Sequence, residues 1–231
     1  MTGLLVKEKE IVVPGEILAE GLEFIPSHGT YRLGDKIYST VIGVFSPENK
    51  ILKIVPINSP YLPSVGDVVI GKIADVGTTF WIIDAGIGYN VFLPLSAASR
   101  GYVDTRKTDI AKMFNVGDDV AVLIENVSSS MMVDGSMKEP GTGKLIGGKI
   151  IEVNPAKIPR IIGKKASMIQ MIKEKTDCRI TVGQNGKIWI NGEPDKILFV
   201  VKIITKITEE AHKSGLTDKI KEILEKGDIN E

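Results

Sequence analysis

The sequence is poor in the residues that form covalent cross-links and metal sites. It has one cysteine, Cys178, and two histidines in 231 residues, which allows no internal disulfide and no cluster with the spacing of zinc ligands. We therefore expect no metal, no cofactor and a reducing, cytoplasmic setting. No apolar run approaches the ~20 residues of a membrane-spanning helix. The amino terminus, MTGLLVKEKE, becomes charged too early for a signal peptide.

The chain also lacks an excess of charge of either sign. Lys+Arg and Asp+Glu are both 29, so the formal net charge is zero. A basic field over the whole surface, which would attract nucleic acid, is excluded, and any basic site must be local. With 43% hydrophobic and 25% charged residues, the composition is typical of a globular protein.

Catalytic motifs are missing as well. A Ser/His or Cys/His nucleophile scheme would need His28, which lies in the turn PSHGTY, or His212, which lies late in a terminal helix. Residues 143–149 match the G-x-x-x-x-G-K skeleton of a nucleotide phosphate loop. Ile150 follows, where a magnesium-binding Ser or Thr is required. We predict that the chain is not an enzyme.

The first segment reads as short β-strands. The stretches IVVPGEIL, KIYSTVIGVF and ILKIVPI are rich in β-branched residues and are separated by turns such as SPENK. The stretch NSPYLPSVGD then interrupts any regular element. We predict a small β-domain over residues 1–63, with its boundary near Pro63.

The second segment, residues 64–146, alternates apolar residues with glycines, which predicts a small barrel of bent strands. Strand alternation sends Phe80 and Trp81 to opposite faces, so one packs inside and the other meets solvent. An exposed aromatic ring on a barrel is a stacking platform for bases. The alternative is that Phe80, Trp81, Tyr89 and Phe92 only pack in the core or in turns, which composition alone favours.

The third segment, residues 147–231, has the order β, α, α, β, β, α and ends with a charged helix, LTDKIKEILEKG. Asn185-Gly186 is a hairpin signal between two strands. A long helix begins near Pro194, and we expect Gly215 to stop it. This order predicts an α+β domain.

The stretch RIIGKKASMIQMI opens a helix of this domain with Gly163, Lys164 and Lys165. Amides at a helix start can receive phosphates, and the lysines would neutralise them. The alternative is an ordinary helix start, because Ser167 and Gln170 match a capping box. The setting favours the first interpretation, since a β-α-α-β-β-α unit with a glycine-lysine turn is the layout of the KH domain, whose loop clamps a single-stranded backbone.

Together, the motifs give the chain a family resemblance. VVPGEIL with GTY, YLPSVGDVVIGKI leading to FLPLS, and IPRIIGKKASMI with VGQNGKIWING resemble the archaeal exosome RNA-binding cap subunit of the ribosomal-RNA-processing type. The resemblance covers nearly the whole chain. One departure is Ala166, because KH loops usually close with a second glycine. Family members of this kind also carry a G-x-N-G motif, here residues 183–186.

The resemblance implies a mostly β fold with an α+β C-terminal domain: a small N-terminal β-domain, an S1-type OB-fold barrel and a KH domain. It implies a non-catalytic subunit that binds single-stranded RNA and guides its 3′ end toward a phosphorolytic ring during RNA processing and degradation. Three such subunits, or a mixture with a zinc-bearing cap protein, would sit on a hexameric ring of RNase-PH-type subunits. The N-terminal domain would grip that ring.

The expected RNA contacts comprise aromatic and basic residues of the barrel and the two loops of the KH domain. They are Trp81, Phe92, Arg100, Arg160, Gly163, Lys164, Lys165, Gly183, Asn185 and Gly186. By pattern alone, the last three belong equally well to a simple hairpin turn.

Two other functions remain open at this point. The chain could be a free-standing OB/KH regulator, although elongation factors of that kind carry two KH domains and only one fits after Gly147. It could also be a purely structural ring clamp, which the zero net charge favours.

Overall fold

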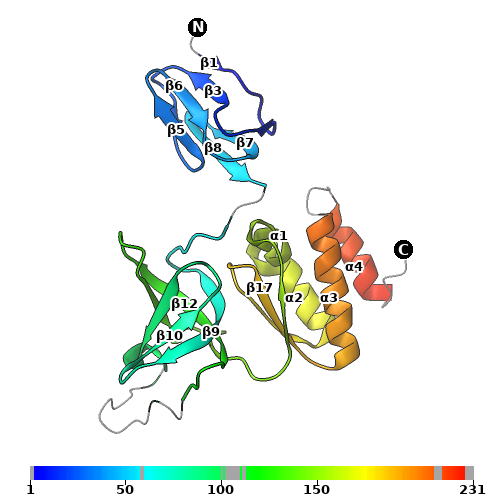
Figure 1. Ribbon diagram of the computed structural model, residues 1–231. Coiled ribbons are helices and arrows are strands. Elements are labelled where there is room, and N and C mark those ends of the chain that lie inside the picture. The colour runs from blue at the N-terminus through cyan, green and yellow to red at the C-terminus, as the bar shows by residue number, and fades with distance from the viewer. Residues whose placement is uncertain are drawn as a thin grey trace. The chain divides into compact units, whose positions relative to one another are not determined.

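The computed structural model describes residues 3–57, 60–99, 101, 110, 113–210 and 215–226. The chain divides into two compact units, Met1–Ser59 and Pro60–Glu231 (Figure 1). The sequence pattern put the first boundary near Pro63. Tyr61 nevertheless belongs to the second unit, because its hydroxyl donates to Asp67 Oδ2 at 2.6 Å and its ring packs on the barrel core.

Two β-sheets, in which most strand pairs are antiparallel, form the first unit. One has the order β1 (Gly3–Leu4), β3 (Ile17–Glu20), β6 (Lys36–Ser39), β5 (Thr30–Leu33). The other has the order β2 (Ile11–Val12), β7 (Gly43–Glu48), β8 (Ile51–Pro56), β4 (Ile25–Pro26). Alternate residues of these strands point inward and form a buried core that includes Val12, Leu18, Ile37, Phe45, Leu52 and Ile54. The predicted all-β unit is confirmed.

The second unit begins with a closed barrel. Its strands are β9 (Val68–Val76), β10 (Phe80–Asp84), β11 (Asn90–Pro94), β12 (Asp119–Val127), β13 (Val133–Ser136) and β14 (Gly143–Lys144). The 3-10 helix η1 (Leu95–Ala97) follows β11. The order is β13-β11-β10-β9-β12-β14, and the pairing of β12 with β13 closes the barrel. A glycine is required at Gly71, because a Cβ there would lie 2.6 Å from Ile83 Cγ2 and 2.8 Å from the Asp84 carbonyl oxygen. The predicted barrel is confirmed.

The rest of the second unit is an α+β fold, as predicted. Its elements are β15 (Lys149–Glu152), η3 (Pro155–Lys157), α1 (Ile158–Ile162), η4 (Lys164–Ala166), α2 (Ser167–Thr176), β16 (Arg179–Val182), β17 (Lys187–Asn191), α3 (Pro194–Glu209) and α4 (Leu216–Lys226). The strands form an antiparallel sheet of order β15-β17-β16. The helices lie together on one side of β17 (Figure 1).

Apolar residues at helical spacing bind these helices to the sheet. Pro194 occupies the first turn of α3, and the helix buries Val200, Ile203, Ile204 and Ile207. The predicted stop at Gly215 is wrong: α3 ends at Glu209, and Gly215, with φ 75°, directly precedes α4. Among the described residues, no helix is long and apolar enough to cross a membrane.

Candidate nucleic-acid interface

An aromatic pair lies on the outer surface of the barrel. Phe80 and Phe92, on neighbouring strands, have ring centroids 4.7 Å apart at an interplanar angle of 32°. Phe92 is 39% exposed. Phe80 was not among the predicted contacts, although the alternation of β10 indicated that one residue of Phe80 and Trp81 would meet solvent. Phe80 is half-buried against Phe92, so the exposed ring of Phe92 is the one that offers bases a stacking surface.

Trp81 has the opposite orientation. Its side chain is 0% exposed, and its Nε1 donates to the carbonyl oxygen of Phe114 at 3.2 Å. The two rings also meet edge-to-face, with centroids 5.1 Å apart. The expectation that Trp81 stacks on RNA is wrong, because a ring inside the barrel core has no face for a base.

Two arginines, Arg100 and Arg160, were predicted to contact RNA. Arg100 lies outside the described residues. Arg160 lies in the last turn of α1 and is partly buried.

The loop between α1 and α2 has an unusual backbone. Gly163 has φ 75° and ψ 173°, while Lys165 (φ 52°) and Ala166 (φ 62°) both adopt the left-handed conformation. That conformation costs a non-glycine residue roughly 1–2 kcal/mol. A Cβ at Gly163 would lie 2.7 Å from Cβ of Met168, so this position requires glycine. Strained backbone of this kind concentrates at functional sites.

The exposed side chains of this loop are those of Lys164 and Lys165. The capping-box alternative is wrong: Ala166 is the N-cap of α2, and Ser167 is already helical, with φ −62° and ψ −38°. The first amide of α2, Ser167 N, already donates to the carbonyl oxygen of Lys164, and the N-cap Ala166 has no side-chain oxygen that could accept from the amides that follow. Those following amides and the two lysines can therefore face an anion.

The predicted loop at residues 183–186 joins two domains. It is the hairpin turn between β16 and β17, with Gly183 N donating to Lys187 O at 2.8 Å. Asn185 Oδ1 accepts from Ile70 N at 3.2 Å, and its Nδ2 donates to the carbonyl oxygens of Ile70 and Ala85, both at 2.8 Å. Gln184 N also donates to Val68 O at 2.8 Å. The turn thus fastens the KH sheet to β9 and to the chain after β10.

This arrangement corrects the expectation for the motif as an RNA contact. Asn185 is 9% exposed, and both amide hydrogens and the amide oxygen are already used. Gly183 and Gly186 are required because a larger residue would clash. A Cβ at Gly183 would lie 2.4 Å from Asn185 Oδ1, and one at Gly186 would lie 2.3 Å from Val153 O. The motif holds the barrel against the KH domain.

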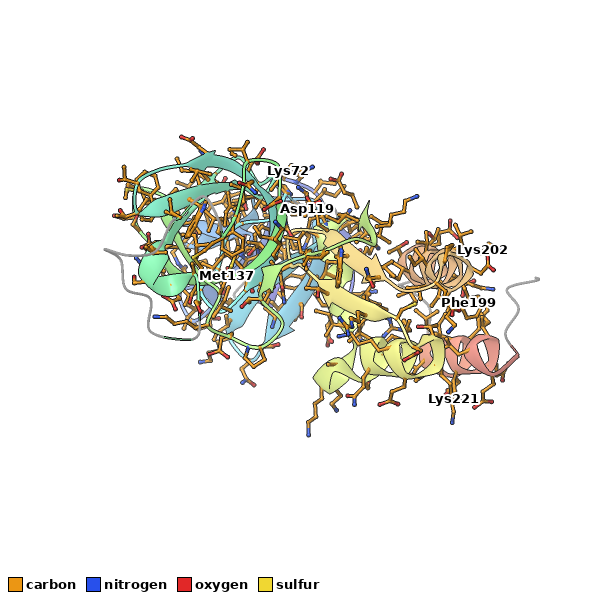
Figure 2. The ribbon with its side chains drawn as sticks, turned by 90° about the horizontal axis from the view of Figure 1, so that it is seen from below. Lys72, Asp119, Met137, Phe199, Lys202 and Lys221 are labelled. Carbon is orange, nitrogen blue, oxygen red and sulfur yellow. The ribbon has the colours of Figure 1, made fainter. Side chains whose placement is uncertain are left out.

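Apolar packing extends this junction. Ile70 and Ala121 of the barrel form a buried cluster with Trp189 of β17, whose Nε1 donates to Gly147 O at 2.7 Å. Lys72 and Asp119 lie next to each other on the barrel, with Nζ and Oδ1 3.7 Å apart (Figure 2). The two domains therefore pack together as one compact unit.

A hollow of about 500 Å³ opens between the chain that enters the barrel and the α1 side of the KH domain. Its lining includes Tyr61, Leu62, Ile158, Ile162 and Gly163, so it borders the lysine loop. Burial and the hydrogen bond to Asp67, which also lines the hollow, raise the pKa of Tyr61 above its usual range. An apolar hollow beside two lysines can accommodate a base next to its phosphate.

Among the described residues, no group of three or more His, Cys, Asp or Glu side chains is arranged to hold a metal ion. The surface described above offers stacking, cationic and hydrogen-bonding groups. Such groups serve recognition of a strand.

Family models match the chain along most of its length. Residues 9–58 match the exosome RNA binding protein RRP4 N-terminal domain, residues 60–124 match the RRP4 S1 domain, and residues 148–196 match the KH domain.

Curated relatives and a solved structure agree with these matches. The chain is 40% identical over 227 residues to the exosome complex component Rrp4 of Thermococcus kodakarensis, covering 97% of this chain and 88% of that protein. It is 41% identical over 221 residues to the protein of the same name from Methanothermus fervidus, covering 96% and 97%. A crystal structure described as a putative exosome complex RNA-binding protein aligns with a TM-score of 0.62 and 34% identity, over 73% of this chain and 97% of that one. The chain belongs to the Rrp4 family of exosome complex components.

Proposed function

We propose that this chain is the non-catalytic, RNA-binding cap subunit of an archaeal exosome. It binds single-stranded RNA and guides the 3′ end into a ring of RNase-PH-type subunits, where phosphorolysis takes place. The observation that carries this proposal is the placement of the Phe80–Phe92 pair, with its exposed Phe92 ring, and the lysine loop on one compact unit.

The two RNA-facing elements supply complementary interactions. Phe92 offers a face to bases, which is worth roughly 1–3 kcal/mol per stacked base and tolerates any sequence. Lys164 and Lys165 offer charge to phosphates, which positions a strand without reading it. The hydrogen bonds of Asn185 join the barrel to the KH domain, so the two elements belong to one compact unit.

The first unit supplies the docking surface for the ring. Ile11, Val44 and Val55 lie side by side across β2, β7 and β8, and Ile25 pairs with Ile51 on the same outer face. Ile11, Ile25, Ile51 and Val55 are 61, 56, 44 and 53% exposed, respectively.

The opposite face of the same strands already packs in the core. Strands that are apolar on both faces are typical of sheets covered on both sides. An exposed apolar patch marks a protein partner more than an RNA partner. The Lys53–Glu48 ion pair on this sheet neutralises its own charges, which further disfavours RNA as the occupant. We assign this outer face to the ring, in a cap of three such subunits or of a mixture with the zinc-bearing relative.

The first experiment measures RNA binding. F92A should weaken binding to a labelled single-stranded 12-mer by the stacking contribution of roughly 1–3 kcal/mol. Y89A alters an aromatic residue of similar exposure, 36%, that lies outside the Phe80–Phe92 pair, and should have a smaller effect. A folded F92A protein with wild-type affinity would favour the structural-clamp alternative. RNA shortening by wild-type protein free of ring subunits would contradict the non-catalytic role.

The second experiment measures assembly. V55E places a charge on the outer apolar face and should abolish co-elution with purified ring subunits while retaining RNA affinity. L198E is the matched control, because Leu198 on α3 is exposed to a similar extent, 56% against 53%. Full-stoichiometry co-elution of V55E would refute the docking face. A wild-type protein that binds RNA but never the ring would favour the free-standing regulator.

A further inference from the structure

A row of side chains crosses the outer face of the barrel beside Phe92. Ile82 of β10 pairs with Phe92 of β11, Phe92 pairs with Asp134 of β13, and Asp134 pairs with Asn126 of β12. Residues directly opposite one another on paired strands point to the same face, so these four lie next to one another. A carboxylate thus stands beside the aromatic ring assigned to base stacking.

The row borders a hollow of about 270 Å³. Its lining consists of Ile82, Asn90, Phe92, Met132, Val133 and Asp134. The ring, the aliphatic side chains and the thioether of Met132 provide apolar contact, while Asn90 and Asp134 provide polar groups. This is the composition expected of a pocket for one flat, partly polar ligand such as a nucleobase.

The carboxylate has a fixed orientation. Asn126 Nδ2 donates to Asp134 Oδ2 at 3.1 Å. The neighbouring Val133 is buried, so strand alternation keeps Asp134 on the outer side. The other oxygen, Oδ1, is available to accept a hydrogen bond from a ligand.

An ionised carboxylate only accepts hydrogen bonds, and it repels phosphate groups. Its useful partner on RNA is therefore an N–H group of a base. Cytosine presents an N4 amino group, adenine an N6 amino group and guanine an N2 amino group. Uracil presents the acceptor O4 at the position where cytosine has its amino group, and its own ring donor, N3–H, lies between the carbonyl oxygens O4 and O2, which a carboxylate repels.

We propose that Asp134, positioned by Asn126, makes the pocket at Phe92 select bases that carry an exocyclic amino group and discriminate against uracil. This inference rests on the proposed binding of RNA at Phe92. The comparison of cytosine with uracil isolates the effect, because the two pyrimidines stack through rings of the same size and differ at the group that Asp134 would meet.

The test measures binding of fluorescent C12 and U12 by anisotropy at one salt concentration. Wild-type protein should bind C12 more tightly, on the order of 3–10-fold, which is the range of one net hydrogen bond. D134N should bring the ratio to one or reverse it, because its amide can donate to uracil O4. N126A leaves the carboxylate in place without its hydrogen bond and should lower the ratio less.

Charge alone must be separated from base recognition. D134N removes a negative charge and should raise the affinity for both strands. E225Q removes the same charge from an exposed position on α4, away from the hollow, and should leave the ratio of C12 to U12 affinities unchanged.

The outcomes distinguish this inference from the proposal beneath it. Equal binding of C12 and U12 by wild type, or an unchanged ratio in folded D134N, would overturn the selection by Asp134 while leaving RNA binding intact. Unchanged affinity of F92A for both strands would instead remove Phe92 from the RNA site, and the proposed function would fail at that point.

Discussion

The side chain of Asn185 joins the two domains of the second unit, and its removal gives the sharpest test of the structure. N185A deletes three hydrogen bonds at once: one from Ile70 N and one each to the carbonyl oxygens of Ile70 and Ala85. The substitution leaves these three backbone groups without their partner at a buried junction.

The magnitude follows from the number of groups that lose a partner. A buried polar group without a hydrogen bond costs about 1–3 kcal/mol. Because Asn185 is 9% exposed, water reaches this site poorly, and we expect a loss of about 3 kcal/mol or more in the free energy that holds the domains together. N185D should be at least as harmful at neutral pH, since it directs a second carboxylate oxygen at two carbonyl oxygens.

Trp189 is a built-in reporter of this junction. It packs against Ile70 and Ala121, and the other tryptophan of the chain, Trp81, can be removed as W81F. Unfolding by urea is followed by the fluorescence of Trp189 in W81F and in the double variant W81F/N185A. The double variant should unfold at a much lower urea concentration.

The matched control is N191A, which removes one hydrogen bond, from Asn191 Nδ2 to Ile146 O at 3.1 Å, at a more exposed position. It should cost less than about 1 kcal/mol, since a single net hydrogen bond is worth about that much. If N185A and N191A lower the urea midpoint equally, the hydrogen bonds of Asn185 are not what holds the barrel to the KH domain.

Two further predictions concern the lysine loop. The double variant K164A/K165A should weaken binding of unrelated single strands about equally and reduce the slope of log affinity against log salt by about 1.4, since each phosphate contact on a single strand contributes roughly 0.7. If the double variant is folded and its salt slope is unchanged, the lysines do not contact phosphates and the barrel alone binds the RNA. K165G should raise stability to urea by about 0.5–1 kcal/mol, because Lys165 has φ 52° and glycine adopts the left-handed conformation without steric cost. A decrease in stability would show that the loop is not strained at this residue.

Local patterns of the sequence determined the kinds of elements and their order. β-branched runs, glycine corners and helical spacing predicted an all-β unit, a barrel and an α+β domain, because backbone preference and the period of apolar residues act within a few neighbouring residues. The same patterns predicted that Phe80 and Trp81 face opposite sides, and that Asn185-Gly186 is a turn.

Only the tertiary structure decided which face of each element is buried and which distant segments meet. Strand alternation does not say whether Phe80 or Trp81 points inward; the closure of the barrel around Trp81 does. Asn185 reads as a turn residue, and its role depends on Ile70, which lies 115 residues earlier in the chain. Asp134 likewise belongs to no local sequence motif. Its place beside Phe92 follows only from the register between β11 and β13. Contacts between residues far apart in sequence depend on the path of the whole chain, and local preferences do not encode them.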